Sequence, residues 1–278
     1  MFYGLSYAKK TQIIPTYNNL LTTIFLYAKI CPKQVLGLIF NLRTRCKMKL
    51  RNPFKGLTKK EWIILSCSLI IVLVSNLLAK NPSIFTVLGT LVGATALIFI
   101  ARGDFFGQIL CILFAILYSI TSIQYKYWGE VITYLGMSAP IALVSVITWI
   151  KNPYKEDKSV VKIQKLNKRT IIIVFLLTVI VTSAFYFILK AFNTPNLITS
   201  TLSITTSFLA STLMLLRSPY YAVAYGLNDV VLIILWIMAS ITDLGYLPMV
   251  ACFVTFLFND TYGFISWSTR EKSQAKNL

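Results

Sequence analysis

The chain has 278 residues, of which 56% are hydrophobic and only 13% are charged, against about 25% charged in a typical soluble domain. A soluble fold of this length would lack polar residues to cover its surface, and disordered chains have the opposite composition, so both classes are excluded. The 27 Lys and Arg outnumber the 9 Asp and Glu, giving a net charge of +18. Whether this charge serves nucleic acid or a membrane depends on where it lies.

The residue types on which most enzymes and metal sites depend are scarce. The sequence contains no His, and no two of its five Cys form a C-x-x-C pair, so we expect no metal site and no cofactor. It also contains no G-x-x-x-x-G-K-[ST] phosphate loop, so we do not expect ATP binding by that motif. Two Asp within apolar segments would permit an intramembrane aspartyl enzyme, but neither has a G-x-G-D context. We therefore expect a protein that is not an enzyme.

Eight apolar segments follow one another along the chain, each close to the 20 or so residues that a bilayer-spanning helix needs. They run over about 62–80, 84–101, 105–125, 129–150, 171–191, 197–216, 220–242 and 246–268. The segments are continuously apolar rather than alternating, which argues against a β-barrel and leaves the α-helix as the spanning structure. The sequence therefore predicts an all-α integral membrane protein with eight transmembrane helices.

The basic residues are divided unevenly between the two sides of these spans. If the N-terminus is cytoplasmic, every Lys and Arg falls on the cytoplasmic side except Lys80, Lys126 and Lys190. This positive-inside pattern predicts that both termini face the cytoplasm. Removing any one span would put the large basic segments on opposite sides, so the charges also support eight spans. With the charge explained by topology, we expect a lipid bilayer and no nucleic acid as partner.

Residues 1–61 are expected to form a cytoplasmic N-terminal tail. Within it, residues 20–40 are moderately apolar, but two lysines and a proline interrupt them, so they are too broken to span. They could form an amphipathic helix at the lipid surface or a mobile tail. A third interpretation places the natural start at Met48, which leads directly into the first span and would make 1–47 non-native. No suitable cleavage site indicates a signal peptide.

A motif near the end of one predicted helix recurs later in the chain. In each copy an Arg ends an apolar helix, two aromatic residues follow three and four positions later, and a Trp ends the third helix. The Arg and Trp are Arg102 and Trp149 in the first copy, and Arg217 and Trp267 in the second. The alternative is that apolar helix triplets simply look alike. The repeated motif favours an internal duplication.

The duplication predicts a domain organisation of three helices, one linker and three helices. The first repeat covers 84–150 and the second 197–268, with a basic loop and linker helix at 151–191 between them. The span at 62–80 is accessory, and 269–278 is a cytoplasmic tail. Because one linker helix returns the chain to its starting side, the two repeats are parallel. Some secondary transporters have this plan, with the substrate site between the repeats.

Two Asn–Asp pairs lie inside predicted spans, where polar residues are costly and usually functional. Asn228-Asp229 and Asn259-Asp260 are each roughly 12–13 Å from the cytoplasmic end of their span, at about 1.5 Å per residue. Both pairs are therefore at similar depth and could face one cavity. They would bind the hydroxyl and amide groups of a ligand and provide a carboxylate for a cation. Alternatively, they pair across the helices as packing contacts.

Aromatic residues continue the polar stripe of the seventh span. Tyr221 and Tyr225 are four residues apart on the helical face that Asn228 and Asp229 extend. Trp236 lies two turns further outward. Such a face suits a flat heteroaromatic ring, more so if the ring is charged, although interfacial aromatic belts also contain Tyr and Trp. We expect belt positions for Tyr127, Trp128, Trp149 and Trp267.

Two stretches carry the motifs of a known family. They are Tyr127-Trp128-Gly129-Glu130 followed by Pro140 and Trp149, and the Asn-Asp-x-Tyr-Gly-x-x-x-Trp run from Asn259 to Trp267, which includes Tyr262. Over about 62–268 the chain resembles the PnuC family of bacterial nicotinamide riboside transporters. The resemblance implies a full-length SWEET-like fold with an accessory N-terminal span, a homotrimer in the bacterial plasma membrane, and facilitated diffusion with a cytoplasmic kinase that traps the substrate.

The chain departs from this family at some substrate positions. The family's W-x-x-W-x-x-x-N motif lies on the second helix of the second repeat, and Asn228 matches its Asn. Tyr221 and Ala224 stand at the Trp positions, with Tyr225 beside them, and Ala142 stands where the family has a Gln. Thiamine and deoxynucleosides, the substrates of similar carriers, therefore stay open beside nicotinamide riboside.

We therefore expect a transporter for a vitamin precursor or nucleoside, with nicotinamide riboside first, that works by alternating access. The expected substrate-binding residues are Tyr221, Tyr225, Asn228, Asp229, Trp236, Asn259, Asp260 and Tyr262. The two Asp leave coupling to protons or ions open. The basic residues of 151–170 are expected to set the topology and face lipid. A membrane sensor or assembly subunit is the alternative, with residues 1–61 as its only sizeable partner surface.

Overall fold

The computed structural model describes residues 52–79, 83–124, 127–155, 157–194, 196–241 and 243–276. The predictions for residues 1–51 lie outside these ranges, and so do Lys80 and Lys126. Residues 53–278 form one compact unit.

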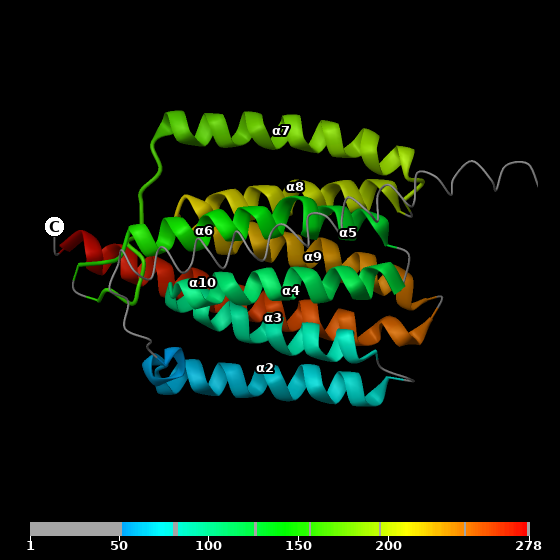
Figure 1. Ribbon diagram of the computed structural model, residues 1–278, viewed down its shortest axis with the longest axis horizontal. Helices are drawn as coiled ribbons and strands as arrows, with labels where there is room; N and C mark the ends of the chain where they lie inside the picture. The colour runs from blue at the N-terminus through cyan, green and yellow to red at the C-terminus, as the bar shows by residue number, and fades with distance from the viewer. Residues whose placement is uncertain are drawn as a thin grey trace, which may run out of the picture. The chain divides into compact units, whose positions relative to one another are not determined.

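Eight helices in the described part of the chain are long and apolar enough to cross a membrane, which confirms the predicted fold class (Figure 1). They are α2 (Lys59–Leu78), α3 (Ile84–Arg102), α4 (Phe105–Gln124), the run of α5 (Trp128–Thr133), η2 (Tyr134–Ser138) and α6 (Ala139–Lys151), α7 (Lys168–Ala191), α8 (Leu197–Leu215), α9 (Tyr221–Ser240) and α10 (Leu247–Lys276). Short 3₁₀ turns, η1 (Pro53–Gly56) and η3 (Leu244–Tyr246), precede α2 and α10.

Six of these helices form a closed ring. Taken in the order α3, α4, α6, α8, α9 and α10, each packs against the next, and α10 packs back against α3. The other two lie outside the ring, α2 against α3 and α10, and α7 against α8 (Figure 1). Each helix therefore packs on at least one other, and the centre of the ring is bordered by six different segments.

The two tryptophans that end the third helix of each predicted repeat are buried in the ring. Trp149 donates its Nε1–H to the carbonyl of Met214 at 3.3 Å, and Trp267 donates to the carbonyl of Ile100 at 2.8 Å. Their ring centroids are 5.4 Å apart. The prediction that both lie in an aromatic belt is wrong, because their exposed fractions are 2% and 0%. Each instead ties the last helix of one triplet to the first helix of the other.

The turns after α3 and α8 have the same backbone conformation. Gly103 and Arg217 both have positive φ, at 80° and 60°, and each donates its amide to a carbonyl three residues earlier. These carbonyls belong to Ile100 and Met214, at 2.7 Å and 3.0 Å, the same two that accept the tryptophan hydrogen bonds. The backbone therefore matches Arg217 with Gly103 and not with Arg102. The two predicted repeats are therefore aligned by the residue with left-handed conformation that follows each helix, Gly103 or Arg217.

The loop between α6 and α7 crosses the ends of several helices. Val161 donates its amide to the carbonyl of Gly103, and Gln164 donates to that of Arg217, both at 3.0 Å. The loop therefore hydrogen-bonds both equivalent turns. Gln274 of α10 accepts from the amide of Ile163 at 2.9 Å. The described basic side chains of this loop are exposed, whereas Val160, Val161 and Ile163 are buried. Whether the basic residues face lipid stays a prediction.

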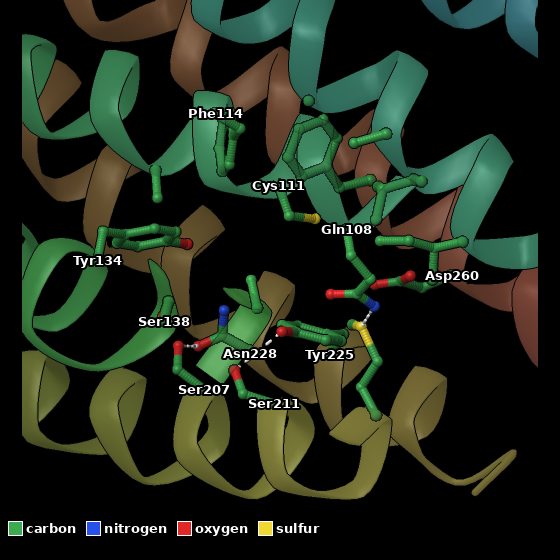
Figure 2. A pocket seen from close by; sticks show the side chains of 18 of the residues that line it. Gln108, Cys111, Phe114, Tyr134, Ser138, Ser207, Ser211, Tyr225, Asn228 and Asp260 are labelled. Atoms are coloured by element: carbon green, nitrogen blue, oxygen red, sulfur yellow. Dashed lines mark hydrogen bonds between the residues drawn. The ribbon is translucent and has the colours of Figure 1, made fainter. Parts of the chain in front are cut away.

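The fourth span contains a turn of π-helix that the hydropathy pattern did not indicate. In η2 the amide of Ala139 donates to the carbonyl of Tyr134, five residues earlier. Pro140 has no amide hydrogen to donate to Gly136, and its ring crowds the preceding turn. Such wide turns are frequent at functional sites, and this one points Tyr134 and Ser138 toward the centre of the ring (Figure 2).

The last helix continues well past the predicted end at 268. Arg270 donates to the carbonyl of Arg102 at the end of α3 and forms an ion pair with Glu61 of α2, with N and O atoms 3.7 Å apart. Glu61 also caps α2 by accepting from the amide of Thr58 at 2.7 Å. The predicted tail at 269–278 is therefore helical to Lys276 and packs at the same end of the ring as the α6–α7 loop.

Candidate functional site

A cavity of about 70 Å³ lies inside the ring and is lined by all six of its helices (Figure 2). The lining residues are Gly93, Ala96, Leu97, Ile100, Gln108, Cys111, Phe114, Ala115, Tyr134, Ser138, Ile141, Ala142, Ser145, Ser207, Ser211, Met214, Tyr225, Asn228, Asp229, Phe253, Phe256 and Asp260. One water needs about 10–15 Å³ of such space, so the cavity has room for several. Its mixed aromatic and polar lining is typical of a small-molecule site.

Helices α8 and α9 hold an amide in a fixed orientation at the cavity. The Oδ1 atom of Asn228 accepts hydrogen bonds from the hydroxyls of Thr206 and Ser207, each at 2.9 Å. The hydroxyl of Tyr225, one turn earlier on α9, is 2.9 Å from that of Ser211. With Oδ1 occupied, the amide nitrogen of Asn228 points into the cavity (Figure 2). The side chain is thus oriented to donate hydrogen bonds to a ligand.

Two carboxyl groups face each other at the contact between α9 and α10. Asp229 and Asp260 lie within hydrogen-bonding range of each other, and each is only 3% exposed. The Oδ2 atom of Asp229 has no hydrogen-bond partner among the described residues. None of the described lining residues is Lys or Arg. The cavity therefore carries acidic groups with no basic partner in its lining.

Helix α4 contributes a second amide, which the sequence analysis missed. Gln108 is almost fully buried and donates its Nε2–H to the sulfur of Met214. Thioether sulfur is a weak acceptor, so exchanging this partner for a ligand oxygen costs little. Figure 2 shows Gln108 beside Asp260, with Tyr134 and Ser138 at the other end of the cavity. The signal available in the sequence was an amide within the apolar first half of this helix.

Four of the predicted substrate-binding residues line the cavity, namely Tyr225, Asn228, Asp229 and Asp260. The other four, Tyr221, Trp236, Asn259 and Tyr262, lie outside its lining. Successive residues of a helix point in directions about 100° apart. Equal depth in the membrane therefore does not place both members of a pair in one cavity.

Asn259 and Tyr262 face the accessory helix instead of the cavity. The Oδ1 atom of Asn259 accepts a hydrogen bond from Ser68 of α2 at 3.0 Å. Tyr262 lies within hydrogen-bonding range of Glu61 and Ser266. For Asn259 the geometry matches the packing alternative rather than ligand binding, because the side chain joins α10 to α2.

Tyr221 and Trp236 belong to aromatic clusters above and below the Asn228 level of α9. The ring of Tyr221 packs against Trp267 with centroids 4.8 Å apart. Trp236 packs against Tyr127 with centroids 5.0 Å apart, so Tyr127 is buried rather than in the expected belt position. Both predicted residues therefore support the walls around the cavity without lining it.

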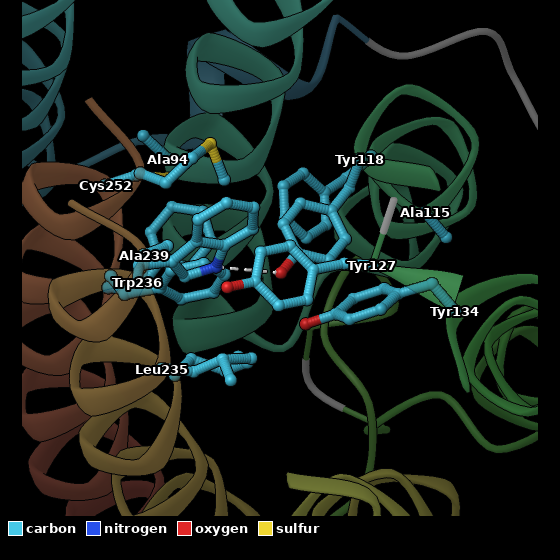
Figure 3. Close-up of a cluster of buried hydrophobic side chains, with 14 residues drawn as sticks. Ala94, Ala115, Tyr118, Tyr127, Tyr134, Leu235, Trp236, Ala239 and Cys252 are labelled. Atoms are coloured by element: carbon cyan, nitrogen blue, oxygen red, sulfur yellow. Dashed lines mark hydrogen bonds between the residues drawn. The ribbon is translucent and has the colours of Figure 1, made fainter. Parts of the chain in front are cut away.

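A buried hydrogen-bond network joins the Trp236 cluster to a third acidic residue. Trp236 donates its Nε1–H to the hydroxyl of Tyr118 at 3.1 Å (Figure 3). That hydroxyl lies 3.4 Å from a carboxylate oxygen of Glu130, whose other oxygen accepts from Ser203 at 3.3 Å. Tyr134, which lines the cavity, packs on Tyr118 with ring centroids 4.4 Å apart. The network thus braces α4, α5, α8 and α9 behind the cavity wall.

The two predicted repeats bring different chemistry to equivalent positions. Counting along the chain from the two equivalent carbonyls, Leu97 corresponds to Ser211, and Phe114 corresponds to Asn228. By the same count Ala115 corresponds to Asp229. The cavity accordingly has a largely apolar wall from α3 and α4, apart from Gln108, and its acidic groups are Asp229 of α9 and Asp260 of α10, beside the polar side chains of α8 and α9. A ligand that fits both walls has a flat apolar face and several polar groups.

A ring of membrane-spanning helices around a central two-walled cavity is the architecture of a membrane transporter. Residues 83–269 match the family model described as nicotinamide mononucleotide transporter, and the chain belongs to this family. The predicted resemblance to the PnuC family is confirmed.

Two relatives show how far the similarity extends. The chain is 24% identical over 180 residues to the nicotinamide riboside transporter PnuC of Neisseria mucosa. The aligned residues make up 63% of this chain and 68% of that protein. The crystal structure of the vitamin B3 transporter PnuC has the same fold, with a TM-score of 0.69 and 24% identity over 79% of this chain and 94% of that chain. The chain is therefore a multi-pass membrane transporter.

Proposed function

We propose that the chain carries nicotinamide riboside, a nucleoside whose pyridinium ring has a fixed positive charge. The observation that carries this proposal is the acidic wall with no Lys or Arg among the described lining residues. A nucleotide would place its phosphate against two carboxyl groups, whereas phosphate sites in proteins are built from Arg, Lys or helix N-termini. The site therefore favours the cationic nucleoside over nicotinamide mononucleotide, the compound after which the family model is named.

The remaining lining residues suit the face of the substrate's ring and its neutral polar groups. Phe114, Tyr134 and Tyr225 offer aromatic faces for the charged ring, which attracts the negative face of an aromatic system. Gln108 and Asn228 offer amides for the carboxamide and ribose hydroxyls. Together these groups supply the few placed polar contacts that fix orientation in an otherwise apolar pocket.

Uptake by purified protein in liposomes tests the substrate. We expect labelled nicotinamide riboside to enter, and excess unlabelled nicotinamide riboside to compete fully, while nicotinamide mononucleotide at the same concentration competes at least tenfold less well. Thiamine, which is also a cation, and thymidine, which is neutral, serve as the competitors that separate charge from ring shape. Competition by the mononucleotide as strong as that by the nucleoside would refute the charge argument.

We propose that transport occurs by alternating access between two parallel repeats, 84–150 and 197–268, that rock about the cavity. The equivalent hydrogen bonds of Trp149 and Trp267 support this organisation, since each repeat holds the other by the same contact. The resemblance also implies that the substrate moves down its own gradient and that a cytoplasmic kinase traps it.

Both termini are proposed to face the cytoplasm, and the functional form is proposed to be a homotrimer. The described ends of the unit, around Pro53 and Lys276, lie at the same end of the helices as the basic α6–α7 loop (Figure 1), which supports the orientation by the positive-inside rule. For the trimer, the support is the resemblance. The outer face of α7 is apolar and exposed and suits lipid or another copy equally.

A further inference from the structure

Residues 152–164 of the α6–α7 loop, here called the strap, begin with a small hairpin. Tyr154 donates its amide to the carbonyl of Val160 at 2.7 Å, and Lys162 donates to that of Asn152 at 2.9 Å. Asn152 directly follows the last residue of α6. The hairpin is therefore attached to the third helix of the first predicted repeat, and it moves with that helix.

The far edge of the strap is bound to the second predicted repeat. Gln274, near the C-terminal end of α10 (Figure 1), accepts from the amide of Ile163 at 2.9 Å and donates to the carbonyl of Val161 at 3.3 Å. Gln164 donates its amide to the carbonyl of Arg217 at 3.0 Å, and its side-chain oxygen accepts from the guanidinium of Arg217 at 2.6 Å. The strap thus starts in one predicted repeat and is fastened to the other.

The apolar side chains of the strap cover the end of the ring. Val161 and Ile163 are buried in one apolar cluster with Trp149 and Trp267. The same cluster contains Met214, which lines the cavity. The strap is therefore part of the barrier that separates the cavity from the solvent at this end.

Gln274 stabilises the strap in its closed position. Its side chain is only 6% exposed, and its two hydrogen bonds satisfy a backbone amide and a backbone carbonyl that the closed strap buries. Buried polar groups without partners are costly, whereas water satisfies the same groups once the strap lifts. Gln274 follows residues 83–269, which match the family model, so this contact lies outside the matched part of the chain.

We propose that the strap is the gate at the cytoplasmic end of the carrier, and that its release from Gln274 and Arg217 opens the cavity to the cytoplasm. The proposal rests on the proposed function in two respects, that the two repeats rock and that this end faces the cytoplasm. Release of the strap involves no ion or proton. It changes how often the cavity opens and leaves the direction of net transport to the substrate gradient.

Labelling of Cys111 measures opening without any substrate. This thiol lines the cavity (Figure 2), so in a full-length chain with Cys111 as its only cysteine a membrane-impermeant thiol reagent reaches it through whichever side is open. Inverted and right-side-out membrane vesicles present the cytoplasmic and external sides separately. The test variant is Gln274→Leu, and the matched control is Ser273→Leu at the exposed neighbouring position of α10.

The side from which labelling accelerates decides the result. Each hydrogen bond changes an equilibrium constant by about two- to twelvefold, so we expect Gln274→Leu to label at least about fivefold faster in inverted vesicles. In right-side-out vesicles its rate should match that of Ser273→Leu. Equal rates for the two variants in inverted vesicles would overturn the gate. Faster labelling of Gln274→Leu from both sides would also overturn it, because that result indicates general loosening of the fold.

A reversible cross-link tests the gate in the opposite direction. Ile163→Cys and Gln274→Cys are combined in a full-length chain without the native cysteines, and a short bifunctional thiosulfonate joins the two thiols through disulfides. We expect linking to abolish uptake of labelled nicotinamide riboside into liposomes and reduction to restore it, while chains with either cysteine alone keep their uptake. Undiminished uptake by fully linked protein overturns the proposal. No uptake by the wild-type chain refutes the proposed function instead, and the labelling result still decides the gate.

Discussion

Replacing Asn228 by Ala tests the position of the binding site most directly. The change removes the amide that points into the cavity, and it removes the acceptor of the Ser207 hydroxyl. Thr206 keeps the carbonyl of Leu202 as an alternative acceptor at 2.9 Å. Losing a buried polar partner costs about 1–3 kcal/mol, and 1.4 kcal/mol is tenfold in Kd. We therefore expect the affinity for nicotinamide riboside to fall by about five- to 150-fold.

The companion change Asn259→Ala separates the cavity from the packing contact. Asn259 lies at the predicted depth of Asn228 but hydrogen-bonds Ser68 of α2. Its removal should lower the thermal stability in detergent by the cost of one interhelical hydrogen bond, about 0.6–2 kcal/mol, and leave the affinity within about twofold. Titration calorimetry and thermal unfolding of the purified variants measure both quantities. Equal losses of affinity in the two variants would refute the site derived from the structure.

Two further predictions concern the ring itself. Trp149→Phe and Trp267→Phe should each lower the free energy of unfolding by about 1 kcal/mol, because each variant loses one of the two equivalent interhelical hydrogen bonds. Thermal unfolding measures this loss. A much larger effect in only one of the variants would argue against equivalent roles. Gly93→Ala should weaken nicotinamide riboside binding, because a Cβ there would overlap the ring of Phe256 and lie 2.9 Å from Phe114, so the rings must move toward the cavity. Unchanged Kd for Gly93→Ala in calorimetry would contradict this packing.

Hydropathy and charge were sufficient to predict the eight spans, since a bilayer leaves few alternatives for long apolar segments. The helix ends were harder, because they depend on particular contacts. The extension of α10 depends on the contacts of Arg270 with Arg102 and Glu61, which join three segments distant in the sequence. The π-helical turn depends on Pro140, whose effect on the preceding turn is local but does not change hydropathy.

The sequence predicted how deep in the membrane the candidate site residues lie, but not in which direction their side chains point. A depth estimate counts residues, and the 1.5 Å rise makes it tolerant of small errors. Direction changes by about 100° with each residue, so Asp260 lines the cavity while Asn259 faces α2. Gln108 lies on α4, in the other predicted repeat, and only the closed ring brings it next to Asp260 (Figure 2). Sequence periodicity within one helix cannot contain that information.

The difference between the two proposed repeats bears on how a duplicated fold would hold an asymmetric ligand. The scaffold contacts are equivalent, because Trp149 and Trp267 hydrogen-bond equivalent carbonyls. The cavity positions are not, because Phe114 stands at the position that corresponds to Asn228 of the second predicted repeat. In the proposed mechanism, equivalent contacts at the helix ends let the two proposed repeats rock as similar bodies, and unequal side chains at the centre bind one end of the substrate each. Phe114→Asn should therefore weaken nicotinamide riboside binding in calorimetry, and it should also lower the stability in thermal unfolding, because Phe114 packs against Tyr118, Tyr134 and Phe256 in the core.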